Sequence, residues 1–341
     1  MNKKKVTMED IANELKISKV SVYKALNDKH DISEELKRKV FDCAVRLNYK
    51  YIDPLVKQCR NFYYIIPKRF MSSTEQFYFG IFKELSKILS DIGATIEIHI
   101  ADQDFSPKDF NTNVRAYRHE KAKTYGVFWA GIIPAQTLES FLDIDIPIIC
   151  IDNYIQNRTG SFIYIDDYHA GYEMTEFLIQ QGHRNICFVI ETAISTNIDK
   201  FYGFQKALYE YKIPFTPSMH INLSLANMQN FKYFNIPSPL PTAFLFDSDY
   251  SAQNFLITMI SKGYDIPKDF SVASFDNTSL CEETIPRLTS IGVEPKEIAN
   301  AAYRMMLKRL SSTHIKPYMM ILYSSITIRD SVGTCRETSI E

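Results

Sequence analysis

The sequence predicts an N-terminal all-α helix-turn-helix headpiece followed by an α/β core of two Rossmann-like lobes. Three observations predict this fold class. Residues 7–47 contain three short stretches with apolar side chains at helical spacing. From residue 62 onward, short β-branched or aromatic runs alternate with helical stretches. The length of 341 residues suits two or three compact units, at roughly 100–200 residues per domain.

The composition excludes several other classes of protein. Hydrophobic residues make up 45% of the chain and charged residues 23%, which excludes a disordered or fibrous chain. No window approaches ~18 consecutive apolar residues, and no apolar stretch follows the basic start, so we expect no membrane span and no secretory signal. The six cysteines are scattered without a Cys-x-x-Cys pair, which indicates neither a disulfide framework nor a metal site. We therefore expect a cytoplasmic chain without a cofactor.

The charge is distributed unevenly along the chain. Residues 1–61 carry 14 Lys and Arg against 9 Asp and Glu, whereas the remaining residues carry 25 against 31. A small basic head on a larger acidic body indicates that the head binds a polyanion.

Three short helices are expected in the head. Thr7 and Asp10 have the spacing of a capping box, Ser18 can cap the second helix, and the third begins near Ser33. The apolar faces consist of Met8, Ile11, Ala12 and Leu15, then Val22, Ala25 and Leu26, then Leu36, Val40, Ala44 and Leu47. Three short helices joined by tight turns form the helix-turn-helix layout, which binds DNA through its second helix.

The second helix directs a second set of side chains away from its apolar face. These side chains are Lys19, Val20, Ser21, Tyr23 and Lys24. A Lys can donate to guanine O6 and N7, and a Val can pack on a thymine methyl group. Thr7, Ser18, Asn27 and Ser33 lie at helix ends, where hydroxyl and amide groups can contact phosphates. The pattern alone is equally compatible with a three-helix bundle whose lysines are only solvated.

Several segments of the head resemble the headpiece of the lac repressor (LacI/GalR) family. They are residues 6–12, 17–27, 38–40 and 47–49, in the family's order. The resemblance implies binding to double-stranded DNA, with Lys19, Val20 and Lys24 at base-reading positions. It places Thr7, Ser18, Tyr23, Asn27, Ser33 and Tyr49 on or near phosphate-contacting positions. The chain departs from the family at Lys16, where the family usually has Gly, and at Tyr23 and Lys24, where it usually has Ser and Arg.

Residues 53–60 predict a short helix, with Asp53 as N-cap and Pro54 in the first turn. In the family this stretch is a hinge helix that pairs in the dimer and wedges a Leu into the minor groove. Cys59 falls on the Leu position if one residue is inserted near Tyr51, and Gln58 does so otherwise. Neither is a good apolar wedge, and a plain tether is the alternative. Lys57 is an expected DNA contact in this stretch.

The core alternates strands with helices, which indicates parallel sheets covered on both faces. The expected strands are residues 62–66, 95–100, 126–130, 147–151, 162–165, 185–190, 242–246, 271–275 and 288–291. The expected helices are residues 77–92, 168–181, 199–211, 252–262 and 295–310. About 270 residues are too many for one such unit and suit two lobes with a ligand between their strand ends.

The core also resembles the effector-binding core of the family, which is itself similar to periplasmic sugar-binding proteins. The segments that carry this resemblance are residues 181–186, 203–208, 241–243, 263–267 and 271–276. The resemblance implies three crossings between lobes, expected near Ile165, Ile291 and Tyr318. The expected domains are therefore a headpiece (1–52), a hinge or linker (53–61), a core (62–330) and a tail (331–341). Within the core, one lobe comprises 62–165 and 292–317, and the other 166–291 and 318–330.

Candidate effector contacts follow from the resemblance and from the expected strand ends. Asp152, Ser248 and Asp276 each follow a predicted strand, where a ligand lies in such folds. Gln76 and Phe77 precede or begin the first core helix, where the family lines its cleft. Lys200 stands where sugar-responsive members carry Arg, and as a lone cation it would pair with an anionic or hydroxylated ligand. Carboxylates, amides and an aromatic ring suit a sugar or a sugar derivative.

An enzyme is not expected, because the chain has no nucleophile-elbow, dinucleotide or phosphate-loop motif. The sequence predicts a homodimeric transcriptional repressor that binds a DNA operator and whose operator affinity is controlled by a small-molecule effector, with no membrane partner. Two alternatives stay open. One is a regulator that does not respond to an effector, and the other is a sugar-binding protein without a DNA function.

Overall fold

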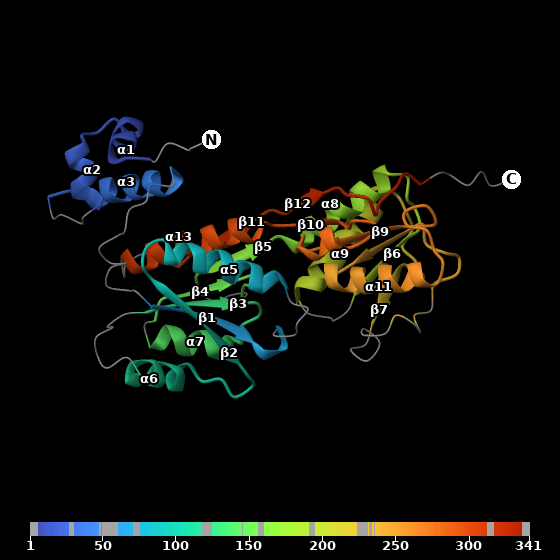
Figure 1. The fold of residues 1–341 in the computed structure, drawn as a ribbon, viewed down its shortest axis with the longest axis horizontal. Helices are drawn as coiled ribbons and strands as arrows, with labels where there is room; N and C mark the ends of the chain where they lie inside the picture. The colour runs from blue at the N-terminus through green and yellow to red at the C-terminus, as the bar shows by residue number, and fades with distance from the viewer. Residues whose placement is uncertain are drawn as a thin grey trace.

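The structure of the chain is a computed structural model, in which a helical headpiece precedes two α/β lobes (Figure 1). It describes residues 6–26, 31–47, 49, 61–70, 76–117, 125–144, 146–155, 160–190, 195–223, 231, 234, 236–311 and 317–335. The expected hinge at residues 53–60 lies outside the described residues. None of the described helices is both long and apolar enough to cross a bilayer.

The headpiece is built from α1 (Met8–Leu15), α2 (Lys19–Leu26) and α3 (Glu34–Arg46). The predicted capping box is confirmed, because the Thr7 hydroxyl accepts from the Asp10 backbone N–H while the Asp10 carboxylate accepts from the Thr7 backbone N–H. The predicted apolar faces pack together. The buried residues of this small core are Ile11, Ala12, Val22, Ala25, Leu26, Val40, Cys43 and Ala44.

The first lobe contains a parallel six-stranded sheet in the order β11-β5-β4-β3-β1-β2. Its strands are β1 (Asn61–Pro67), β2 (Thr95–Ala101), β3 (Gly126–Ala130), β4 (Ile148–Ile151), β5 (Phe162–Ile165) and β11 (Met319–Leu322). One face packs on α5 (Gln76–Ser90) and α13 (Pro295–Ser311), and the other on α6 (Pro107–Tyr117) and α7 (Ala135–Asp143). Successive side chains of a strand point to opposite faces of the sheet. In β1, Tyr64 therefore packs in the core under α5, and Tyr63 packs in the core under α6.

The second lobe contains a six-stranded sheet in the order β12-β10-β9-β8-β6-β7, in which only the β10–β12 pair is antiparallel among the described strands. Its strands are β6 (Ile186–Ile190), β7 (His220–Asn222), β8 (Ala243–Phe246), β9 (Ser271–Phe275), β10 (Thr289–Gly292) and β12 (Ser325–Thr327). The helices α8 (Asp167–Gln180) and α9 (Ser195–Glu210) cover one face, and α11 (Asp249–Ser261) covers the other. Short elements are η1 (Lys68–Phe70), η2 (Pro217–Met219) and α12 (Leu280–Glu283).

The α/β core of two lobes is confirmed, and every strand and helix predicted for the core is present. Three short strands (β7, β11 and β12) and three helices (α6, α7 and α12) were not predicted individually.

The chain passes between the lobes after β5, after β10 and after β11. The expectation that the third crossing lies near Tyr318 is wrong, because Met319–Leu322 still pairs with β5 in the first sheet. The crossing lies at Tyr323 and Ser324, just before β12. The edge strand β11 has only four residues, which is too short a run to show a strand period in the sequence.

Candidate functional site

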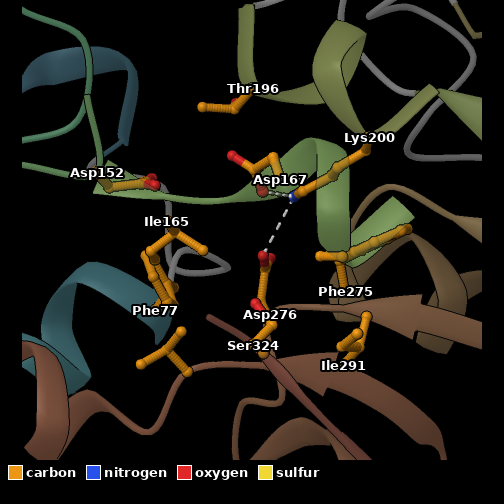
Figure 2. A pocket seen from close by; sticks show the side chains of 13 residues that line it. Phe77, Asp152, Ile165, Asp167, Thr196, Lys200, Phe275, Asp276, Ile291 and Ser324 are labelled. Atoms are coloured by element: carbon orange, nitrogen blue, oxygen red, sulfur yellow. Dashed lines mark hydrogen bonds and ion pairs between the residues drawn. The ribbon is translucent and has the colours of Figure 1, made fainter. Parts of the chain in front are cut away.

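A cavity lies between the two lobes, where the carboxyl ends of their strands meet (Figure 2). Its charged lining consists of Asp152 after β4, Asp167 at the start of α8, Lys200 in α9 and Asp276 after β9. The other lining residues are Phe77, Ile165, Ala170, Thr196, Phe275, Ile291, Gly292, Val293 and Ser324. The empty space between the lining atoms is about 350 Å³, part of which is open to solvent.

Lys200 is the central residue of this lining and is only 6% exposed. Its Nζ donates to the backbone oxygen of Asp247 at 3.1 Å. The same atom lies 3.4 Å from Asp276 Oδ1 and 3.7 Å from Asp167 Oδ1, as the dashed lines in Figure 2 mark. Burial alone would lower the pKa of Lys200, but the surrounding carboxylates, chiefly Asp276 and Asp167, raise it above its usual value. The ammonium group therefore stays charged.

The position of Lys200 depends on a close crossing of α8 and α9. A Cβ added to Gly203 in α9 would lie 2.0 Å from the backbone oxygen of Tyr168 in α8, so only glycine fits there. This crossing brings the N-terminal turn of α8, which carries Asp167, next to the turn of α9 that carries Lys200. The glycine at 203 was part of the family resemblance in the sequence, and its packing role follows from this contact.

Asp152 contributes a carboxylate from the first lobe. Its Oδ2 accepts a hydrogen bond from the Tyr78 hydroxyl at 2.8 Å. Burial raises the pKa of Asp152 to about 6, although the Tyr78 hydrogen bond and the Lys200 charge oppose this shift. Burial also raises the pKa of Asp167 well above its ordinary value, against the opposing charge of Lys200. The lining therefore carries carboxyl groups that resist full ionisation.

Two of the lining aspartates have an unfavourable backbone conformation. Asp152 has a φ of 60° and Asp276 a φ of 98°, both in the region that L-residues other than glycine rarely adopt. Each such residue costs about 1–3 kcal/mol and persists where the surrounding structure imposes it. Strain at two strand ends that face one cavity is typical of a functional site.

The structure brings together four of the six sequence-predicted effector residues: Phe77, Asp152, Lys200 and Asp276 line the cavity. Gln76 instead lies beside it, and its Oε1 accepts from the Ser279 hydroxyl across the two lobes. Ser248 is not among the lining residues. Its hydroxyl caps α11 by accepting from the Ser251 backbone N–H, so this side chain serves a helix end rather than the cavity.

Sequence reasoning missed Asp167, Thr196, Phe275 and Ser324 in the lining. Asp167 follows Asp166, which caps α8 by accepting from the His169 backbone N–H. The end of the predicted strand at Ile165 could have identified Asp167, because the chain crosses from the first lobe to the second at this point. Among the residues that the structure describes, no group of His, Cys, Asp and Glu has the geometry to hold a metal ion.

In the headpiece, α2 exposes the side chains that the sequence predicts to meet DNA. Val20 is 61% exposed and Tyr23 50% exposed, so the outer face of α2 presents apolar as well as charged side chains. Lys19 pairs with Glu9 at 3.2 Å, and Lys24 pairs with Asp31. Both ion pairs are exposed and therefore weak, so either lysine can exchange its carboxylate for another acceptor.

The remaining predicted DNA contacts lie at helix ends or outside the described residues. Thr7, Ser18 and Ser33 cap α1, α2 and α3, and the Ser18 hydroxyl also bonds to that of Ser21. Tyr49 packs partly buried on the headpiece core. Asn27, Lys57 and Cys59 lie outside the described residues.

Two family models match the core. A model described as periplasmic binding proteins and sugar binding domain of LacI family matches residues 76–228. A second model, the periplasmic binding protein-like domain, matches residues 175–332. Together they span both lobes and the cavity between them.

Full-length relatives extend the similarity to the headpiece. The chain is 24% identical to catabolite control protein A of Staphylococcus epidermidis, over 95% of this chain and 98% of that protein. It is 25% identical to the probable HTH-type transcriptional repressor ExuR of Bacillus subtilis, over 96% and 98%. A solved complex of the transcriptional regulator CelR with cellobiose has the same fold, with a TM-score of 0.66 at 18% identity over 96% of this chain and 100% of that one. The headpiece, the two-lobed core and these similarities together show that the chain belongs to the LacI/GalR family of transcriptional regulators.

Proposed function

We propose that the chain is a homodimeric, cytoplasmic transcriptional repressor that reads an operator with α2 and binds a small molecule between its lobes. The observation that carries the first half is the exposed face of α2, where Val20 and Tyr23 stand beside two weakly paired lysines. A helix with this face, held by two others and following a basic N-terminus, fits the major groove. The relatives of this chain are transcriptional regulators rather than enzymes.

Within this proposal, the side chains of the headpiece divide into two groups. Lys19, Val20 and Lys24 read base edges, the lysines by donating to guanine and Val20 by packing on a thymine methyl group. The second group positions the headpiece on the phosphates. Its members are Thr7, Ser18, Ser21, Tyr23, Asn27, Ser33, Tyr49 and Lys57, with Cys59 at the hinge position.

A ligand bound in the cavity controls the affinity of the headpiece for the operator. A ligand held by Asp152 from one lobe and by Lys200 and Asp276 from the other stabilises one relative arrangement of the lobes. The population shift between DNA-competent and incompetent states is limited by the ligand's difference in affinity for the two. The cellobiose bound to the similar CelR chain supports a small organic effector for this cavity.

The experiment that tests the proposal is selection of binding sites from genomic DNA, performed with the full-length chain and with a chain that begins at Phe62. The proposal predicts a two-fold symmetric site for the full-length chain and no enrichment for the shortened one, because a dimer presents two copies of α2. Enrichment that survives removal of residues 1–61 would contradict a role for the headpiece. A single, non-repeated half-site would contradict the dimer.

One observation favours a second candidate, a regulator that does not respond to an effector. Lys200 already lies within ion-pair distance of Asp167 and Asp276, so these charges are balanced in part without a ligand. A melting-temperature screen separates the two candidates, since a ligand at about 100 times its Kd adds about 2.7 kcal/mol to the stability.

A further inference from the structure

We propose that the effector of this chain is a small hydroxylated amine that is bound as its ammonium form. The inference rests on the proposed function of the cavity and assigns the chemical class of its ligand. It replaces the expectation that Lys200 is a lone cation awaiting an anionic or hydroxylated ligand.

The balance of charge around the cavity favours a cationic ligand. Three carboxylates (Asp152, Asp167 and Asp276) and one ammonium group (Lys200) make up the charged lining among the described residues. Lys200 already lies within ion-pair distance of Asp167 and Asp276 and donates to a backbone oxygen as well. An anionic ligand would therefore find no unpaired cation and would meet three carboxylates. A ligand with its own positive charge would allow all three to ionise.

One carboxylate oxygen in the lining has no hydrogen-bond partner. Asp167 is 5% exposed, and its Oδ2 has no hydrogen-bond partner although the residue lines the cavity. Figure 2 shows its carboxylate directed into the space below Thr196. A buried oxygen that has lost its water and gained no donor is destabilising, so a donor from a ligand is expected there.

A neighbouring buried aspartate shows what a purely structural carboxylate looks like in this lobe. Asp249 is 1% exposed, and its two oxygens accept hydrogen bonds from Ser274, Ser290 and Thr278. Every one of these donors lies within the lobe. Asp167 has no such set of hydroxyl donors, which distinguishes a binding group from a structural one.

The rest of the lining fits a compact ligand with both hydroxyl and ammonium groups. Thr196 and Ser324 offer hydroxyl groups, and the rings of Phe77 and Phe275 form apolar walls. Lys200 lies 5.0 Å from the centroid of the Phe275 ring, so that ring already faces a cation. A metal ion is a poor alternative, because the described residues form no cluster with metal-binding geometry.

The amine should show a dependence on pH that a neutral ligand lacks. The groups that face Asp152 are Tyr78 from α5, Lys200 from α9, Asp276 from the end of β9 and Asp167 from α8. The charge of Asp152 also adds to the effect of burial in raising the pKa of Tyr64 in β1. With the pKa of Asp152 at about 6, the carboxylate that attracts the ammonium group is largely protonated at pH 5. Affinity for the amine should therefore be about tenfold lower at pH 5 than at pH 7.5.

The test measures the melting temperature of the full-length chain against matched sets of small molecules. One set is D-glucosamine, D-glucose, N-acetyl-D-glucosamine and glucose 6-phosphate, and a second is 4-amino-1-butanol, 1,4-butanediol and 4-hydroxybutyrate. The proposal predicts that at least one amine raises the melting temperature at millimolar concentration while its neutral and anionic counterparts do not. A neutral or anionic member that binds better than its amine overturns the proposal, and so does a panel in which no amine binds.

A variant and a second readout separate this proposal from the proposed function. Asp167→Asn keeps the size of the side chain and should weaken the amine roughly 10- to 100-fold, while Asp143→Asn, an exposed carboxylate in α7, should leave it unchanged. Equal loss in the two variants would overturn the role of Asp167. Operator binding is measured on the same preparations: retained operator binding without any amine response rejects this inference alone, whereas absence of operator binding rejects the proposed function.

Discussion

Gly171 in α8 lies directly against the backbone of Lys200 in α9, so that a Cβ on Gly171 would stand 2.0 Å from the Lys200 carbonyl oxygen. This contact is the counterpart of Gly203 against Tyr168 on the other side of the same crossing. The two glycines let the helix axes approach until the Lys200 ammonium reaches Asp167, at the N-terminus of α8. The geometry of the cavity therefore depends on two residues that have no side chain.

Gly171→Ala should separate α8 from α9 and destabilise the chain. The new methyl group meets backbone atoms that cannot move aside, so we expect the free energy of unfolding to fall by about 2–4 kcal/mol. Urea unfolding followed by circular dichroism measures this change. The matched control is Gly80→Ala in α5, whose Cβ would meet only the Pro295 side chain at 3.1 Å and whose helix propensity improves. Equal stability of the two variants would contradict the close crossing.

The stability of the chain should fall as the pH rises through the titration of Asp152. The folded state keeps a proton on this carboxyl up to about pH 6, whereas the unfolded chain releases it near the ordinary value of 3.8. Because the folded state binds more protons in this window, the free energy of unfolding decreases from about pH 4 to pH 6 and stays lower above it.

Asp152→Asn removes that titration and can still accept from the Tyr78 hydroxyl. The variant should be more stable than the parent at pH 7.5 by on the order of 1–3 kcal/mol, and this advantage should shrink at pH 5. Urea unfolding at the two pH values gives both differences, with Asp143→Asn as the exposed control. An advantage that is the same at both values would show that Asp152 is ionised throughout.

Lys16→Gly should stabilise the headpiece. Lys16 ends α1 with a φ of 54° and a ψ of 43°, a left-handed conformation that costs an L-residue roughly 1–2 kcal/mol. Glycine adopts it freely, so hydrogen exchange at the amides of α2 should slow by about 5- to 10-fold. Lys16→Ala is the control, since it removes the same charge and keeps the Cβ. Similar exchange in both variants would show that the backbone at this turn is not strained.

Lys24→Ala should weaken specific operator binding by about 1–3 kcal/mol, because a base-edge contact is lost.

Asp31→Asn should act in the opposite direction, by releasing Lys24 from its ion pair and removing a negative charge near the phosphates. A gain of up to about 1 kcal/mol is expected, as for other exposed pairs. Fluorescence anisotropy on one DNA site at fixed salt measures both. Lys39→Ala on α3, where Lys39 pairs with Glu35, is the control; a loss as large as that of Lys24→Ala would remove the special role of Lys24.

Local patterns in the sequence predict the elements that their own residues specify. The Thr7–Asp10 capping box, the apolar faces of α1 to α3 and the buried strands such as Phe162–Ile165 are all of this kind. The short strands β7 and β12 and the edge strand β11 were missed because three or four partly exposed residues have no periodicity to read.

The cavity could be predicted only in part, because its properties arise between elements. Strand ends identified Asp152 and Asp276, but their positive φ angles follow from the surrounding structure. That Lys200 is already paired depends on the α8–α9 crossing, which spacing along the chain does not reveal. Ser248 shows the opposite case. The resemblance predicts an effector contact at this position, but the hydroxyl caps the N-terminus of α11.

The most direct test of the account is the ratio of affinities for the selected operator and for a scrambled duplex, measured with the parent chain and with a variant in which Lys19, Val20 and Lys24 are all changed to Ala. All three side chains point away from the headpiece core, so the variant should stay folded. The account predicts a ratio of about 10³ or more for the parent and a ratio near one for the variant. A variant that keeps the parent's ratio would contradict the claim that α2 reads the operator.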